Sequence, residues 1–163
     1  MSTRIVIFGN SGAGKSTLAA RRARESGLAH LDLDTLAWLP VTPPRRAPFA
    51  DSAAAIAAFV VAHGNWVIEG CYADLVEFAA VHCTRLVFLN PSIDACVANC
   101  RARPWEPHKY ESPAAQQANL EMLVTWVHAY ATRDDEFSLR AHRALFDRFT
   151  GDKIEITTSR AAV

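Results

Sequence analysis

The chain has 163 residues, of which 50% are hydrophobic and 21% are charged, and its formal net charge at pH 7 is zero. These values are typical of one globular domain, residues 1–163, that is long enough to bury a sizeable core. The balanced charge excludes a function that depends on an overall positive charge, such as non-specific binding of nucleic acid, although a local basic patch remains open.

The N-terminal segment predicts a strand, a glycine-rich loop and a helix in direct succession. Residues 4–8 are an apolar run rich in β-branched side chains, and residues 18–25 have the composition of a helix. Between them the chain reads Gly-Asn-Ser-Gly-Ala-Gly-Lys-Ser-Thr, which matches the motif G-x-x-x-x-G-K-[ST]. A preceding strand and a following helix are the context in which this motif binds the phosphates of a nucleoside triphosphate.

The rest of the chain predicts strands that alternate with helices. We expect strands at 28–33, 66–69, 85–89 and 153–157, helices at 50–63, 73–80 and 91–101, and two helices between 114 and 149 with a break near 134–135. Proline-containing loops at 40–48 and 101–113 interrupt the pattern. This order is typical of an α/β protein with a parallel sheet and helices on both faces.

The glycine-rich loop supplies a binding site for ATP. Its glycines let backbone N–H groups approach a polyphosphate, and the N-terminus of the following helix adds partial positive charge. Lys15 is expected to reach the β- and γ-phosphates, and the Ser16 hydroxyl to bind Mg²⁺. The expected nucleotide-binding residues of the loop are Gly9, Asn10, Ser11, Gly12, Ala13, Gly14, Lys15, Ser16 and Thr17.

Acidic residues follow the second and third predicted strands, at the edge of the sheet where ligands of open α/β folds bind. Asp32 and Asp34 end the second strand, and Glu69 ends the third. One acid could hold Mg²⁺ through water while another orients or deprotonates an acceptor hydroxyl. The alternative is that Asp32 and Asp34 only cap the following turn.

The segment 101–113 predicts a small lid. Arg101 and Arg103 could clamp phosphates or stack on adenine, and the prolines would stiffen a flap that closes over the reactants. Alternatively, both arginines only complement the C-terminus of the preceding helix. Arg133 shares a predicted helix face with aromatic residues and could meet a phosphate. Arg45 and Arg46 lie in the loop after the second strand, where either an acceptor anion or solvent could surround them.

Simple sequence features bear on the cellular location of the protein and on whether its cysteines bind zinc. The chain enters its first strand directly and contains no long apolar run, so we expect no signal peptide, no membrane span and a cytoplasmic protein, monomeric or homodimeric. The cysteines at 71, 83, 96 and 100 lack C-x-x-C spacing, which favours buried free thiols over a zinc site.

The ordered motifs resemble those of P-loop kinases of the nucleoside monophosphate kinase and shikimate kinase type. Within that class the chain looks most like the adenylate-kinase-related proteins labelled DNA topology modulation protein, FlaR-like. The resemblance is carried by the segments at 9–17, 30–38, 66–70, 87–92 and 126–130, together with the arginines at 101 and 103.

This resemblance implies a three-layer P-loop NTPase fold with a five-stranded parallel sheet in the order 2-3-1-4-5, bound ATP and Mg²⁺, and a closing lid. It further implies that Asp34 meets the acceptor, Asp32 lies near the metal and Arg101 covers the adenine, with Thr158–Arg160 bordering the base. The lid sequence at 103–110 matches neither adenylate kinase nor shikimate kinase, and Glu69-Gly70-Cys71-Tyr72 stands in place of a Gly-Gly acceptor motif.

Two functions are therefore expected to compete. The first is a kinase that moves the γ-phosphoryl group of ATP to a small-molecule acceptor, with Lys15, Asp34, Arg101, Arg103 and Arg133 as its catalytic residues and Ser16 and Asp32 at the metal. The second is a nucleotide-gated regulatory ATPase, for which the family label suggests an action on DNA topology. The neutral charge and the lack of a recognition-helix signature count against the second.

Overall fold

The computed structural model, which describes residues 1–158, is built around a parallel sheet. Its strands are β1 (Arg4–Gly9), β2 (Ala29–Asp32), β5 (Trp66–Gly70), β6 (Arg85–Leu89) and β7 (Lys153–Ile156). They lie in the order β2-β5-β1-β6-β7, and every neighbouring pair is parallel. This confirms the expected five-stranded sheet and its order, because β5, β6 and β7 are the third, fourth and fifth strands predicted.

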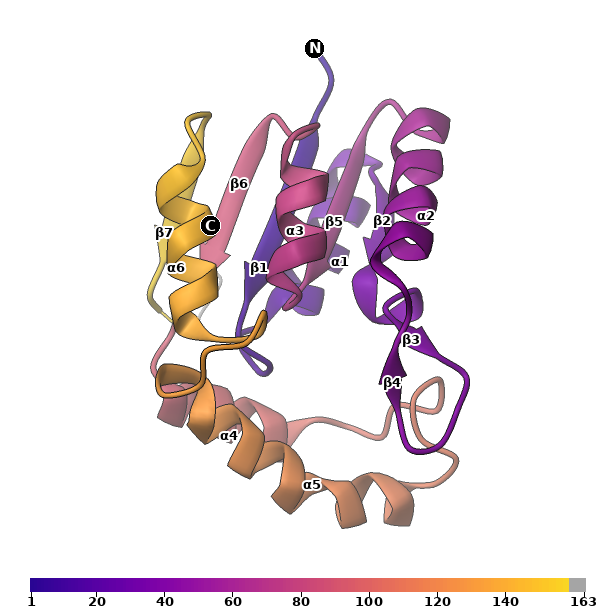
Figure 1. Cartoon of the computed structure of the whole chain (residues 1–163), viewed down its shortest axis with the longest axis vertical. Coiled ribbons are helices and arrows are strands. Elements are labelled where there is room, and N and C mark those ends of the chain that lie inside the picture. The colour runs from indigo at the N-terminus through magenta and orange to yellow at the C-terminus, as the bar shows by residue number, and fades with distance from the viewer. Residues whose placement is uncertain (159–163) are drawn as a thin grey trace.

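Helices cover both faces of the sheet (Figure 1). One face carries α2 (Phe49–Ala62), α3 (Ala73–Ala80) and α6 (Leu139–Arg148), and the other carries α1 (Lys15–Ser26). The helices α4 (Ile93–Ala102) and α5 (Pro113–His128) lie beyond the carboxyl ends of the strands and add side chains to the apolar core on the α1 side. The central strands β1 and β5 are almost entirely buried, as expected for strands covered on both sides. Each face therefore has its own apolar core, and the three-layer α/β class is confirmed.

The predicted break between the last two helices is longer than expected. A 3₁₀ turn, η2 (Ala129–Ala131), follows α5, and α6 begins only after Ser138. The Asp135 carboxylate accepts a hydrogen bond from the backbone N–H of Phe137, and Ser138 caps α6 by accepting one from Ala141 N–H. These local side-chain bonds compete with helix formation and hold residues 132–138 in an irregular path.

The proline-containing loop after β2 is not featureless. A 3₁₀ turn, η1 (Leu33–Thr35), follows β2, and β3 (Trp38–Leu39) pairs antiparallel with β4 (Arg45–Arg46). The sequence did not predict this hairpin. It projects beyond the carboxyl edge of the sheet, and the connection between α4 and α5 lies beyond the same edge (Figure 1). Both segments are thereby placed next to the end of β2.

Candidate functional site

The glycine-rich loop joins β1 to α1 in the form that the motif predicts. Gly12 and Gly14 have φ angles of 80° and 96°, which side chains rarely adopt. Gly14 is the residue before α1, so the first N–H groups of that helix face the open loop. The Lys15 ammonium donates a hydrogen bond of 2.7 Å to the Asn10 carbonyl oxygen and so lies back across the loop. Backbone N–H groups and one cation are collected on a concave surface suited to phosphate.

The loop is held from below by the helices that flank the predicted lid. Asn99 of α4 donates a hydrogen bond of 2.8 Å to the Gly12 carbonyl oxygen, and the Asn10 amide donates one of 3.3 Å to the Val127 carbonyl oxygen of α5. A β-carbon at Gly12 would lie 2.3 Å from the Cys96 carbonyl oxygen, so α4 packs directly against the loop. The position of the loop therefore depends on helices far away in the sequence.

Acidic oxygens gather beside the first turn of α1. Glu69, at the end of β5, is only 2% exposed, and it accepts a hydrogen bond of 2.8 Å from the Ser16 hydroxyl. His30 Nε2 lies 3.4 Å from the same carboxylate, and this partner raises the pKa of His30. Burial, together with the charges of Glu69 and Asp34, raises the pKa of Asp32 to about 6. Such a cluster of oxygens fits a hard cation, which would relieve the repulsion among the carboxylates.

Among residues 1–158 no group of three or more His, Cys, Asp or Glu side chains is arranged to hold a metal by itself. A magnesium ion bound mainly through substrate phosphates and water, with Ser16 as one protein ligand, needs no such group. Asp32 also accepts a hydrogen bond from Asp34 N–H and so caps η1, which is the alternative role considered from the sequence. The donor set fits a phosphate-bound Mg²⁺ and does not fit an all-protein metal centre.

Asp34 is the final acceptor in a short chain of hydrogen bonds between side chains. It accepts a hydrogen bond from the Tyr72 hydroxyl, and Lys109 Nζ lies 3.2 Å from its other carboxylate oxygen. The Trp38 indole N–H donates in turn to the Tyr72 oxygen at 2.8 Å. Burial opposes ionisation, but the Tyr72 hydrogen bond and the charges of Lys109 and Lys15 outweigh it, so the pKa of Asp34 lies below its ordinary value. Asp34 is therefore a fixed, ionised acceptor of hydrogen bonds.

One cleft of about 1450 Å³ is lined both by the glycine-rich loop and by Asp34. At one end it is lined by residues of the glycine-rich loop: Ser11, Gly12, Gly14, Lys15, Ser16 and Thr17. Asp34, Tyr72, Arg103 and Lys109 also line the cleft. A pocket for one drug-sized ligand measures about 300–1,000 Å³, so this volume suits two ligands side by side. Gly9, Asn10 and Ala13 of the loop are buried beneath it.

Several predicted site residues lie elsewhere. The structure pairs Arg101 with Glu121 at 2.8 Å and places it at a separate hollow of about 170 Å³, which Arg103 also lines. Arg133 pairs with Asp135 at 2.7 Å and stacks over the Trp126 ring. Neither arginine is among the residues that line the cleft. Each of them thus has a partner within the protein, and contact of either with a phosphate stays a prediction.

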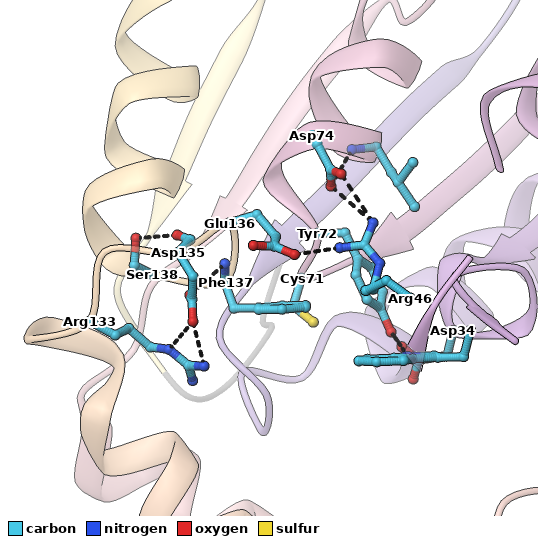
Figure 2. Close-up of polar contacts among 12 residues, drawn as sticks. Asp34, Arg46, Cys71, Tyr72, Asp74, Arg133, Asp135, Glu136, Phe137 and Ser138 are labelled. Atoms are coloured by element: carbon cyan, nitrogen blue, oxygen red, sulfur yellow. Dashed lines mark hydrogen bonds and ion pairs between the residues drawn. The ribbon is translucent and has the colours of Figure 1, made fainter. Parts of the chain in front are cut away.

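Two further expectations concern the flanks of the site. Arg46 contacts Glu136 at 2.7 Å and Asp74 at 3.1 Å, whereas its neighbour Arg45 is exposed (Figure 2). In the stretch Thr158–Arg160 that was expected to border the base, only Thr158 is described, and the remainder lies outside the described residues.

The sequence did not single out Tyr72 or Trp38, and it placed Lys109 in the lid without a role. Tyr72 lies two residues after β5, and Trp38 begins β3 shortly after the turn that follows β2, and an α/β fold collects its ligand-binding residues at this edge. The position of Tyr72 and Trp38 near this edge is the sequence feature that could have identified them as site residues. No helix in the described part of the chain is long and apolar enough to cross a membrane.

No protein-family model and no curated protein matched the sequence. Solved structures do match the fold. The shikimate kinase of Acinetobacter baumannii in complex with shikimate has a TM-score of 0.60 at 16% identity, with 99% of this chain and 87% of that chain covered. The shikimate kinase of Bacteroides thetaiotaomicron also has a TM-score of 0.60 at 16% identity, with 99% and 89% covered.

A gluconokinase from Sinorhizobium meliloti 1021 matches with a TM-score of 0.53 at 16% identity, and the alignment covers 97% of this chain and 83% of that chain. At such identities the likeness concerns the fold alone. The chain thus has the α/β fold of small-molecule kinases that include shikimate kinase and gluconokinase.

Proposed function

We propose that this protein is an ATP-dependent small-molecule kinase that transfers the γ-phosphoryl group of ATP to a hydroxyl group. One observation carries the proposal: a single cleft contains the glycine-rich loop at one end and the ionised Asp34 at the other. Transfer between two bound molecules requires adjoining sites for donor and acceptor. The kinase-type fold supports the same proposal, and the order of the sequence motifs supports a place among adenylate-kinase-related, FlaR-like proteins.

The donor side binds and neutralises phosphate. Backbone N–H groups of residues 11–17 would bind the phosphate oxygens, and Lys15 would exchange its Asn10 partner for them. Ser16, with Glu69 behind it and Asp32 near, would hold Mg²⁺. When bound, the metal supplies positive charge to the phosphate oxygens. Arg103 lines the cleft from the lid and would add to that charge.

The acceptor side orients the attacking oxygen. Asp34 would accept a hydrogen bond from the acceptor hydroxyl while Tyr72 and Lys109 hold its carboxylate in place. The hydroxyl oxygen forms a bond to the γ-phosphorus as the bond from that phosphorus to the β,γ-bridging oxygen breaks. ADP leaves, and the hydroxyl proton passes to Asp34 and then to solvent.

The test is a screen for ADP release by the purified protein with ATP, Mg²⁺ and a panel of small hydroxyl compounds. We expect at least one compound to raise ADP release well above the rate with ATP alone and to yield a phosphorylated product by mass spectrometry. Lys15→Ala should remove this stimulation, since it takes away the phosphate-binding cation of the loop. Full stimulation in a folded Lys15→Ala protein would refute the proposed donor site.

A further inference from the structure

The acceptor end of the cleft has an aromatic wall. Trp38, Tyr72, Trp126 and Phe137 all line the cleft there, and they come from segments far apart in the sequence. The rings of Trp38 and Phe137 are parallel within 1° with their centroids 6.4 Å apart, and the Tyr72 and Trp126 rings meet Phe137 edge-on, each at 5.3 Å. Each ring fixes its neighbours, so the wall is formed before any ligand binds.

Further apolar side chains line the same cleft. They are Leu39, Pro40, Val41, Pro44, Met122 and Leu123. Val41 is 44% exposed and Met122 is 69% exposed. Apolar surface that lines a cleft and stays exposed favours a ligand whose body is itself apolar, because binding removes both surfaces from water.

The arginines nearest to the wall are unavailable to a ligand. Arg46 stands over the Tyr72 ring at 4.9 Å and pairs with two carboxylates, and Arg133 stands over the Trp126 ring at 4.2 Å and pairs with Asp135. Figure 2 shows both guanidinium groups turned to these partners. Neither lines the cleft. Their charges are balanced within the fold, so they offer no site for a carboxylate or phosphate of the acceptor.

Lys15, Arg103 and Lys109 line the cleft, and Lys109 is the one that pairs with Asp34, so its charge is balanced as well. It lies 3.2 Å from Asp34 and 3.7 Å from Glu106, and both carboxylates line the cleft. An anionic acceptor would meet two carboxylates and a lysine that is already paired, which costs binding free energy. A cationic acceptor would meet Lys109, and the Tyr72 and Trp126 rings already carry the protein's own arginines.

We infer that the acceptor is an uncharged alcohol whose body is a flat or apolar ring. The inference rests on the proposed function and names the substrate class of the same site. The ring lies against Trp38 and Phe137, and a hydroxyl on it donates a hydrogen bond to Asp34. This class differs from the shikimate bound in the shikimate kinase structure of Acinetobacter baumannii.

The test reads binding through the tryptophans of the wall, with ADP and Mg²⁺ present so that no turnover is needed. Quenching of fluorescence is titrated with three ligands that share a phenylcarbinol skeleton: 1-phenyl-1,2-ethanediol, mandelate and 2-amino-1-phenylethanol. A second matched pair is uridine and uridine 5′-monophosphate. We expect the uncharged member of each set to bind about tenfold or more tightly than its charged counterparts, because an anionic group would meet Asp34 and Glu106 and an ammonium group would meet Lys109. Equal or tighter binding of a charged member, or no binding by either uncharged member, would overturn the inference.

Two exposed aromatic residues provide matched variants. Trp38 is 41% exposed in the cleft wall, and Phe49 is 46% exposed at the start of α2, outside the cleft. We expect Trp38→Leu to weaken binding of the uncharged ligand about three- to tenfold, the usual value of an aromatic contact, and Phe49→Leu to leave it unchanged. Binding is followed by isothermal calorimetry here, because the first variant removes a fluorophore. An equal loss in both variants would count against the wall.

The inference and the proposed function can fail separately. Binding of uncharged ring alcohols without phosphorylation of any of them would refute the kinase proposal and leave the ligand class intact. Phosphorylation of an anionic acceptor with comparable efficiency would uphold the kinase and refute the uncharged class.

Discussion

At the donor end of the cleft the functional groups come from one continuous segment, residues 9–17, whereas the acceptor end is assembled from side chains of Asp34, Tyr72, Lys109 and Phe137. The donor end works mainly through backbone N–H groups, whose direction is set by local conformation. The acceptor end works through side chains, whose positions are set by long-range packing. The same cleft therefore has one half that is a local property of the chain and one half that is a property of the whole fold.

The largest effect is expected where the acceptor end can be altered without touching the donor end. Asp34→Asn keeps the shape of the side chain but removes the negative charge with which Lys109 pairs and to which Tyr72 donates a hydrogen bond. We expect kcat to fall about 100-fold or more, as for loss of a positioned acid–base group, with little change in nucleotide affinity. The measurements are steady-state kinetics with the identified acceptor and a nucleotide titration by calorimetry. A parallel loss of nucleotide affinity would show that the two ends are not separable.

This division explains what the sequence predicts well. The strand–loop–helix unit follows from local apolar runs, and short strands that recur between helices predict a parallel sheet. The order of the strands within that sheet is implied by the family resemblance and not by the apolar runs. Asp34 and Glu69 could be named because each ends a predicted strand, and the carboxyl ends of parallel strands share one edge.

The other features of the site depend on contacts formed in the folded protein, and no local sequence pattern indicates these contacts. Arg46 can bind an anion, but in the folded protein it pairs with Asp74 and Glu136, which lie 28 and 90 residues away in the sequence. Arg133 pairs with Asp135 only two residues away, and it is the irregular path of residues 132–138 that brings the two side chains together. Lys109 meets Asp34 across a long sequence separation, and no periodicity links the two. The β3–β4 hairpin lies in a proline-containing loop with strands too short to give an alternating pattern.

The donor end can be tested for its own dependence on the rest of the fold. Gly12 and Gly14 both have positive φ angles, so alanine at either position costs about 1–2 kcal/mol of strain. At Gly12 the new β-carbon would also lie 2.3 Å from the Cys96 carbonyl oxygen, whereas at Gly14 nothing lies within 4 Å. We expect Gly12→Ala to reduce the free energy of unfolding by about 1–3 kcal/mol more than Gly14→Ala does. Urea denaturation measures both, and equal losses would mean that α4 does not restrain the loop.

The acceptor end is expected to lose stability in acid. His142 is fully buried, with Nε2 2.7 Å from the Cys71 carbonyl oxygen and Nδ1 2.7 Å from the Tyr130 hydroxyl, and it thus fixes the turn that leads into Tyr72. Burial lowers the pKa of His142 from 6.5 to about 4. Between these values the unfolded state binds more protons than the folded state, so the free energy of unfolding falls as the pH falls.

The size of this effect follows from the same shift. From pH 7 to about pH 4.5 we expect His142 to contribute a loss of about 2 kcal/mol. Asp32, whose pKa is raised to about 6, contributes the opposite slope in every variant. The comparison is therefore between the native protein and His142→Gln, which keeps a donor and an acceptor but does not titrate. Denaturation at both pH values measures it, and identical pH slopes would refute a role for His142.

The smallest effect distinguishes two arginines that the sequence treats alike. Arg103 lines the cleft, while Arg101 is exposed and paired with Glu121 at 2.8 Å. If the lid acts in the conformation described, Arg103→Ala should lower kcat/KM about tenfold through loss of charge near the transferred phosphoryl group, and Arg101→Ala should lower it by a much smaller factor. Exposed ion pairs such as Arg101 with Glu121 contribute little to stability, so both proteins should fold alike. If Arg101→Ala were the more damaging of the two, the lid would have to turn on nucleotide binding so that α4 presents Arg101 to the cleft, and the acceptor end would then be shaped by the donor.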